Sequence, residues 1–247
     1  RQPLPHSTRL AATIPQQRPE PDMTLFAGVT AIDAYCERLG PQFWAEPVNA
    51  VTNTAFVAAG LWGLVAARRA GGDRWTETLA VLVVLIGIGS FLFHTFADSL
   101  TVLLDVIPIW SFVALYVVFT LRRFFRMTWW RTLRGVAIGV AVVAAMSMAM
   151  PESAIRASNG SLQYLPAIVA FVVLAAMLRR TRHPAAPVIL LGGAIFTVSL
   201  GFRTMDAAVC DAFPLGTHFL WHLCNAAMLA CLLHAAVRHG RPKPTTA

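Results

Sequence analysis

Seven long apolar runs constrain this sequence more than any other feature. Runs of about 17–25 apolar residues are long enough to cross the hydrocarbon core of a bilayer as helices. Because 57% of the residues are hydrophobic and only 13% are charged, an ordinary soluble domain is excluded. We therefore expect an all-α, polytopic membrane protein with a bundle of seven transmembrane helices. The runs cover roughly residues 48–67, 78–97, 100–121, 135–150, 162–178, 186–202 and 217–237.

The short connections between these runs leave no room for a second soluble domain, so we expect one membrane domain over residues 31–238. Residues 1–30 are expected to form a disordered N-terminal tail, because their first part is rich in Pro, Gln and Arg and has no apolar run. Residues 239–247 are expected to form a cytoplasmic tail. Met23 begins the first stretch that is typical of structured sequence, which makes it a candidate start residue.

Basic residues gather on one side of the predicted bundle. Alternate connections and the C-terminal tail hold fourteen of the twenty Lys and Arg residues. By the positive-inside rule this side is cytoplasmic, so we expect an extracytoplasmic N-terminus and a cytoplasmic C-terminus, in a bacterial inner membrane. The net charge of +8 then reports topology and contact with anionic lipid headgroups, and it is no evidence for nucleic acid. The fourteen residues are Arg68, Arg69, Arg74, Arg122, Arg123, Arg126, Arg131, Arg134, Arg179, Arg180, Arg182, Arg238, Arg241 and Lys243.

Two histidines four residues apart, His218 and His222, open the seventh run. In a helix their rings lie on one face, and neutral imidazole nitrogens suit zinc. His94, near the end of the second run, is the candidate third ligand. Two alternatives stay open: each histidine only bonds to a neighbouring helix, or Cys224 supplies a further ligand and closes the site.

Other polar residues are expected near the same membrane face. Ser90 shares a helix face with His94 at the extracytoplasmic end of the second run. Asp105 alone among the acids lies well inside an apolar run, and an ionisable group at that depth is costly and therefore indicates function. Asn49 and Asn53, in the first run, are expected to hydrogen-bond between helices.

Three acids, Asp33, Glu37 and Glu46, lie within fourteen residues just before the first run. Clustered oxygen ligands suit calcium. The alternative is a solvated segment, with Glu46 near a helix N-terminus where a carboxylate is favoured. Of the four cysteines, only Cys36 and Cys210 fall in loops predicted to be extracytoplasmic, where an oxidising compartment permits a disulfide.

Taken together, these residues resemble the alkaline ceramidases, within a superfamily of seven-helix membrane hydrolases that also includes the adiponectin-type receptors. The matching segments follow the order of that family and lie close to its spacing. Two departures are that the first motif has an extra residue between Asp33 and Cys36, with no Asn ligand after Glu37, and that Val106 replaces an acid often found there. The segments are residues 33–37 and 45–49, Ser90 with 93–94, Asp105 with Pro108, 203–210, and His218 with 221–222.

The resemblance implies a zinc amide hydrolase that cleaves the N-acyl bond of ceramide or a ceramide-like membrane lipid to a sphingoid base and a fatty acid. The alternatives are a hydrolase of another N-acyl lipid, or a non-catalytic, receptor-like protein that contains zinc. The implied roles are zinc binding by His94, His218 and His222, contact with the catalytic water and substrate by Ser90 and Asp105, calcium binding by Asp33, Glu37 and Glu46, and a Cys36–Cys210 disulfide.

Overall fold

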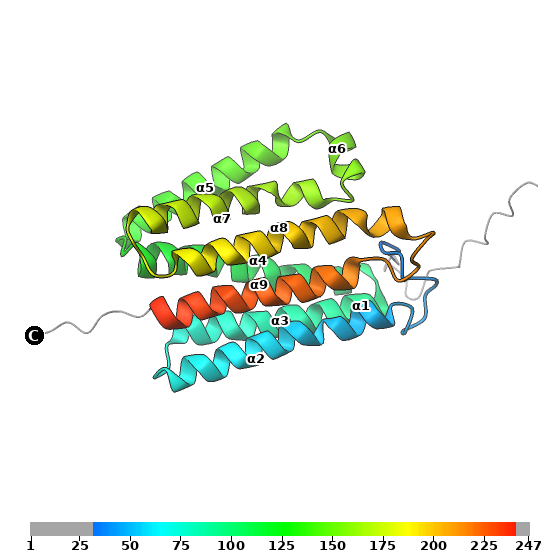
Figure 1. Cartoon of the computed structure of the whole chain (residues 1–247), viewed down its shortest axis with the longest axis horizontal. Coiled ribbons are helices and arrows are strands. Elements are labelled where there is room, and N and C mark those ends of the chain that lie inside the picture. The colour runs from blue at the N-terminus through cyan, green and yellow to red at the C-terminus, as the bar shows by residue number, and fades with distance from the viewer. Residues whose placement is uncertain (1–31, 241–247) are drawn as a thin grey trace, which may run out of the picture.

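The computed structural model describes residues 32–240, and over that range it contains helices and no strands. The long helices run nearly parallel to one axis (Figure 1). The predicted tail over residues 1–30 lies outside the described residues, as does the C-terminal tail from residue 241 onward. The elements are α1 (Pro47–Thr52), α2 (Thr54–Arg69), α3 (Arg74–Phe96), α4 (Ser99–Phe119), the π-helical turn η1 (Thr120–Phe124), α5 (Trp129–Ala149), α6 (Glu152–Ala157), the 3-10 turn η2 (Ser161–Tyr164), α7 (Leu165–Arg180), α8 (Ala186–Val209) and α9 (His218–His239).

Within the described residues, seven helical segments are long and apolar enough to cross a membrane, which confirms the seven predicted runs. Two boundaries differ most: the fourth segment begins at Trp129 and the sixth continues to Val209. In both places Trp, Arg or Asp residues lower the local hydropathy without ending the helix. The segments are Pro47–Arg69, Arg74–Phe96, Ser99–Phe124, Trp129–Ala149, Ser161–Arg180, Ala186–Val209 and His218–His239.

Two local predictions were wrong. The predicted runs, which end at residue 121 and resume at 135, leave residues 122–134 as one connection, but η1 extends α4 to Phe124 and α5 already begins at Trp129. Asn49 and Asn53 were expected to link neighbouring helices. Their amides instead donate within their own segment, Asn49 to Glu46 at 3.1 Å and Asn53 to the Asn49 carbonyl at 2.8 Å.

Helix packing depends on close backbone approach at small residues. A Cβ on Gly60 of α2 would overlap the α3 backbone at Ala80. A Cβ on Gly89 of α3 would overlap the Leu104 carbonyl of α4 and crowd the Cα of Asp105. In a bilayer, lipid tails are as apolar as the helices, so such van der Waals contact is a main source of helix association. The contact at Gly89 also brings Asp105 beside the end of α3.

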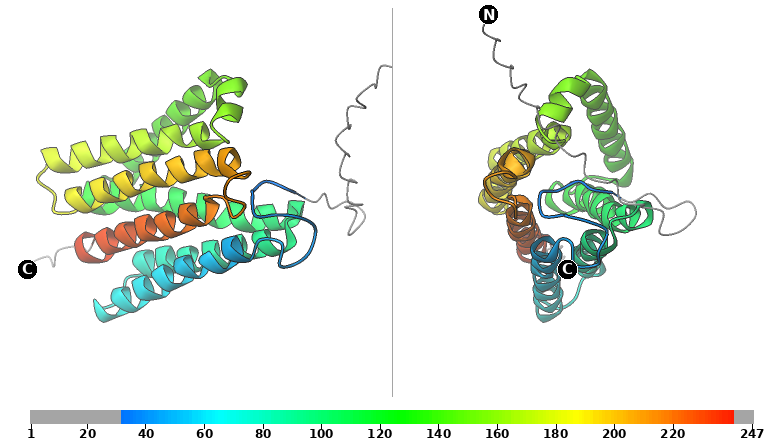
Figure 2. Two further views of the ribbon diagram at one scale, coloured as in Figure 1. Left: turned by 45° about the vertical axis from the view of Figure 1, so that its right-hand side comes forward. Right: turned by 90° about the vertical axis from the view of Figure 1, so that its right-hand side faces the viewer.

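The helices do not share the core equally. Buried apolar side chains join α2, α3, α4, α7, α8 and α9. In α5, by contrast, Thr132 is the one buried residue. The end-on view shows α5 at the edge of the bundle (Figure 2). Most of the α5 surface therefore lies outside the packed core of the bundle.

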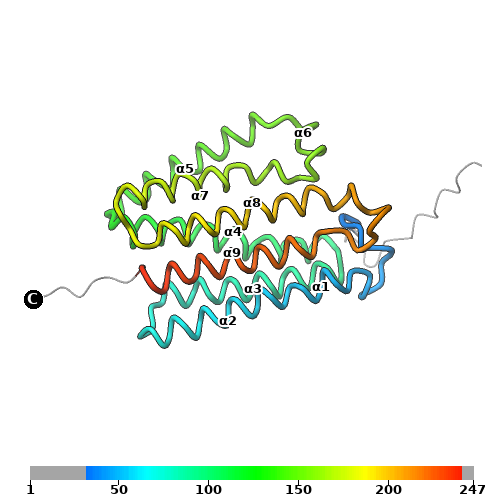
Figure 3. Tube along the Cα trace, in the orientation of Figure 1, coloured from blue at the N-terminus to red at the C-terminus, as the bar shows by residue number. Residues whose placement is uncertain are grey.

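One end of the bundle collects segments that are far apart in the sequence. The loop over residues 32–46, the end of α3 and the connection between α8 and α9 all lie there, opposite the end at which α9 finishes (Figure 3). A disulfide joins Cys36 to Cys210 across a sequence separation of 174, with their Cα atoms 5.2 Å apart. This bridge confirms the predicted pairing and fastens the N-terminal loop to the end of α8.

Candidate metal centre

Three buried histidines come together at this end of the bundle. His94 lies in the last turn of α3, and His218 and His222 lie in the first turns of α9. One side-chain nitrogen from each lies within 4.8 Å of the other two, and each residue is at most 2% exposed. Among residues 32–240 this is the one group of three His, Cys, Asp or Glu side chains with such spacing, and Cys224 does not belong to it.

Hydrogen bonds determine which nitrogen two of the three rings present. The Thr52 hydroxyl donates to the Val48 carbonyl at 2.8 Å, so it accepts from Nδ1–H of His222 at 2.9 Å. The Glu46 carboxylate lies 2.6 Å from Nδ1 of His94, and an ionised carboxylate can only accept. Both rings therefore carry their proton on Nδ1, which leaves a free lone pair on each Nε2.

These two lone pairs face each other. The Nε2 atoms of His94 and His222 lie 3.1 Å apart, a distance at which two acceptors repel unless a cation lies beside both. Two nitrogens that share a tetrahedral zinc at about 2.0–2.1 Å are separated by about 3.3 Å. In addition, Nδ1 of His218 is buried without a hydrogen-bond partner. The donor set therefore fits a divalent metal that favours nitrogen ligands.

Glu46 orients His94 from outside the histidine cluster. Its carboxylate is 2% exposed and lies between Nδ1 of His94 and Nε of Arg38, which is 2.5 Å from the second oxygen. Burial acts to raise the pKa of Glu46, but the hydrogen bond with His94 and the positive charge of Arg38 outweigh it and hold that pKa below its usual value. A carboxylate that accepts from the distal nitrogen of a ligand histidine fixes both its tautomer and its orientation.

The three acids predicted to bind calcium have different partners from one another. Glu37 accepts the backbone N–H groups of Val48 and Asn49 at 2.6 and 2.7 Å, so it caps the first turn of α1. Burial raises the pKa of Glu37, although these two bonds act in the opposite direction. Glu46 is engaged by His94 and Arg38, and Asp33 is exposed. The structure does not bring these three carboxylates together as one ligand group.

Ser90 and Asp105 lie beside the histidine cluster. Ser90 is buried one turn before His94 on α3. Asp105 reaches the same region from α4, where the close approach at Gly89 brings the two helices together. Its polar neighbours are Ser90, His94 and Arg203, and its Oδ1 atom is buried without a hydrogen-bond partner. A buried acceptor without a partner therefore lies in the region of Ser90 and His94.

The family model for ceramidases matches residues 29–245, nearly the whole chain. The chain belongs to the ceramidase family. No curated protein matches it. Membership in the ceramidase family supports a ceramidase-like amide hydrolase, and the histidine group can hold the metal that such a hydrolase uses.

Two residues of this ceramidase-family site were not assigned a role from the sequence. Tyr35 stacks on His218 with ring centroids 3.6 Å apart, and burial raises the pKa of Tyr35 to about 12. Asp206 is 1% exposed and accepts the backbone N–H groups of Thr217, His218 and Cys36 at 2.7, 2.9 and 3.3 Å. It therefore ties α8, the start of α9 and the disulfide together. The signal available in the sequence for Asp206 was its place between the sixth run and the histidine pair of the seventh.

Proposed function

We propose that this chain is a zinc-dependent membrane hydrolase that cleaves the N-acyl bond of ceramide or a ceramide-like lipid to a sphingoid base and a fatty acid. One observation carries the proposal: the Nε2 atoms of His94 and His222 face each other at 3.1 Å, and His218 completes a group of three buried histidines. A purely structural zinc site has four protein ligands, whereas a catalytic site has three and an open position. The group of three histidines matches the second type.

His94, His218 and His222 would hold the zinc. Zinc in such a site lowers the pKa of a water molecule toward about 7 and polarises a carbonyl group. Thr52 and Glu46 would keep two of the rings in the tautomer that presents Nε2. These two partners therefore prepare the site before the metal binds.

Asp105 would act as the proton carrier. As the oxygen of water bonds to the amide carbon, the Asp105 carboxylate takes the proton that the water loses. When the carbon–nitrogen bond breaks, the same proton passes to the departing nitrogen, so the products are a fatty acid and a free amine. Ser90 would donate a hydrogen bond to the amide oxygen as negative charge develops on it, a contribution of a few kcal/mol.

The position of the site suits a lipid substrate. The histidines lie near one end of the apolar bundle, within helices that span the bilayer, so an acyl chain can approach from the membrane while the amide reaches the metal. By the positive-inside rule we propose that this end is extracytoplasmic, with a cytoplasmic C-terminus, in a bacterial inner membrane. The remaining alternatives are hydrolysis of another N-acyl lipid and a receptor-like protein without turnover.

The test is hydrolysis by purified protein with a measured zinc content. The protein is incubated with N-acyl sphingoid bases, N-acyl ethanolamines and N-acyl amino acids, and mass spectrometry measures the released amine and fatty acid. We expect equimolar products from the N-acyl sphingoid bases, and much slower product release from an Asp105→Asn protein with the same zinc content. If only another lipid class gives products, that class replaces ceramide as the proposed substrate. If no lipid gives a product, the receptor-like alternative is favoured.

A further inference from the structure

We propose that the guanidinium of Arg38 takes the place of the calcium ion that the N-terminal acids suggested, so that this chain carries its own cation there. Arg38 is 6% exposed and directly follows Glu37. The part of this proposal in which Arg38 positions His94 as a zinc ligand rests on the proposed function. The part in which Arg38 replaces calcium does not.

Every polar contact of Arg38 in the structure is to oxygen. Its Nε lies 2.5 Å from Oε1 of Glu46, Nη1 donates to the Gly40 carbonyl at 3.1 Å, and Nη2 donates to the His94 carbonyl at 2.9 Å. One carboxylate and two backbone carbonyls are the ligand types that calcium takes in proteins. The N–H groups of the guanidinium therefore donate to oxygens of the kind that would otherwise bind a calcium ion.

The charges around Arg38 are already balanced. A buried carboxylate is costly unless it is paired, and Arg38 pairs with Glu46. Glu37 is stabilised separately, because its two oxygens face the N–H groups at the positive end of α1. Asp33 is exposed to solvent. A calcium ion at this position would meet a fixed positive charge and would have to displace existing hydrogen bonds, so the donor set does not fit calcium.

Arg38 also acts on the metal centre through a second residue. It holds one oxygen of Glu46, and the other oxygen of Glu46 holds Nδ1 of His94. The same guanidinium bonds the main chain of His94, in the last turn of α3. Arg38 is therefore a positioning residue: it fixes the backbone and, through Glu46, the ring of one metal ligand.

The direct test measures calcium binding by equilibrium dialysis with radioactive calcium at constant free zinc. The wild-type protein is expected to retain no calcium, and added calcium is expected to leave its melting temperature unchanged. One calcium per chain in the wild type would overturn the proposal. This measurement does not involve turnover, so the two proposals can fail separately. If the protein hydrolyses no lipid and also binds no calcium, the proposed function is wrong but this inference is supported.

Variants of Arg38 test the positioning role. Arg38→Gln removes the charge, so we expect zinc affinity to fall roughly tenfold to 100-fold, the usual scale for a lost partner of a ligand histidine. In that variant alone, millimolar calcium should raise the melting temperature. Arg38→Lys keeps the charge and should recover part of the zinc affinity. Unchanged zinc affinity in Arg38→Gln would overturn the positioning role; if Arg38→Gln does not fold, wild-type calcium binding and the zinc affinity of Arg38→Lys decide the matter.

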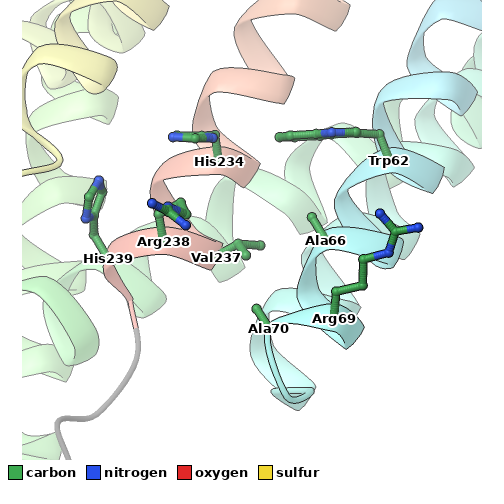
Figure 4. A pocket seen from close by; sticks show the side chains of 8 residues that line it. All are labelled: Trp62, Ala66, Arg69, Ala70, His234, Val237, Arg238 and His239. Carbon is green, nitrogen blue, oxygen red and sulfur yellow. The ribbon is translucent and has the colours of Figure 1, made fainter.

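A groove at the opposite end of the bundle carries an independent inference. It lies between the last turns of α2 and α9 and has a volume of about 560 Å³. Figure 4 shows the Trp62 ring directed across the groove at His234, and the two rings are nearly parallel, with an interplanar angle of 8°. We infer that this groove binds an anionic phospholipid. The lining residues are Trp62, Ala66, Arg69, Ala70, His234, Val237, Arg238 and His239.

The composition of the groove matches both parts of such a lipid. Arg69 and Arg238 line the groove and are exposed, and none of its lining residues is acidic. Guanidinium groups bind phosphate through paired hydrogen bonds, and Trp is favoured at the level of the headgroups. Ala66, Ala70 and Val237 provide an apolar wall for the first part of an acyl chain. The predicted cytoplasmic side is also where anionic lipids attract basic residues.

The test compares melting temperatures in detergent supplemented with phosphatidylglycerol or with phosphatidylcholine. Phosphatidylglycerol is expected to raise the melting temperature of the wild type more, and Arg69→Gln/Arg238→Gln should lose that difference. The matched control is Arg179→Gln/Arg180→Gln, which removes the same charge from exposed positions at the end of α7. By count of spans these positions lie on the same side of the membrane as the groove. This control should keep the difference between the two lipids. An equal loss in both variants, or an equal effect of both lipids, would overturn the inference.

Discussion

The Thr52 hydroxyl accepts a hydrogen bond from Nδ1 of His222 at 2.9 Å, across the contact between α1 and α9. Because the same hydroxyl donates to the Val48 carbonyl, it can only accept from the ring. Thr52→Val keeps the shape of the side chain and removes this acceptor. We expect zinc affinity to fall roughly tenfold to 100-fold with the fold retained.

The matched control for Thr52 is Thr54→Val. Thr54 lies two residues away, is exposed, and bonds only to the Val51 carbonyl. Zinc competition titrations with a coloured chelator should separate the two variants. Equal zinc affinity in both would show that Thr52 does not orient His222.

Removal of a histidine tests the metal centre itself. His218→Ala should abolish stoichiometric zinc, because only two nitrogen ligands would remain at the site. His234→Ala is a suitable control, since His234 lies in the same helix and stacks on Trp62, away from the cluster. Elemental analysis of both proteins gives the answer, and full zinc in His218→Ala would contradict the assignment.

Asp105→Asn separates chemistry from metal binding. The amide keeps the size of the side chain but cannot carry the proton, so turnover should fall by roughly two to four orders of magnitude while zinc content stays the same. Product release measured at equal zinc content checks this. Near-normal turnover would move the proton transfer to another residue.

The Cys36–Cys210 disulfide should contribute strongly to stability. It closes a loop with a sequence separation of 174, for which the chain-entropy model gives on the order of 5 kcal/mol as an upper figure. Reductant, or the Cys36→Ser/Cys210→Ser pair, should lower the melting temperature. The Cys224→Ser/Cys231→Ser pair removes only free thiols and should respond to reductant as the wild type does.

The proposed orientation places the histidines near the extracytoplasmic face. In a Cys224→Ser/Cys231→Ser background, Glu152→Cys lies in α6 at the histidine end, whereas Arg180→Cys lies at the opposite end of α7. Both positions are exposed. A membrane-impermeant maleimide added to intact cells should label the first and spare the second. The reverse pattern would invert the topology.

The sequence alone determined the features that depend on local periodicity. Apolar runs of sufficient length specify spanning helices, because a backbone inside the bilayer must satisfy its hydrogen bonds within its own segment. The spacing of His218 and His222 places both rings on one face of a helix. The depth of Asp105 within its run similarly indicates a functional acid.

Tertiary structure alone decided which polar groups meet. Glu46 bonds to His94, 48 residues away, and Thr52 bonds to His222, 170 residues away, so neither contact leaves a local pattern. The composition of the acids before the first span suggested a calcium site. In the structure, Glu37 instead accepts hydrogen bonds from the N-terminus of α1, and Glu46 forms an ion pair with Arg38. A carboxylate binds whichever cation or N–H group the fold brings within reach, and that choice depends on packing between distant segments.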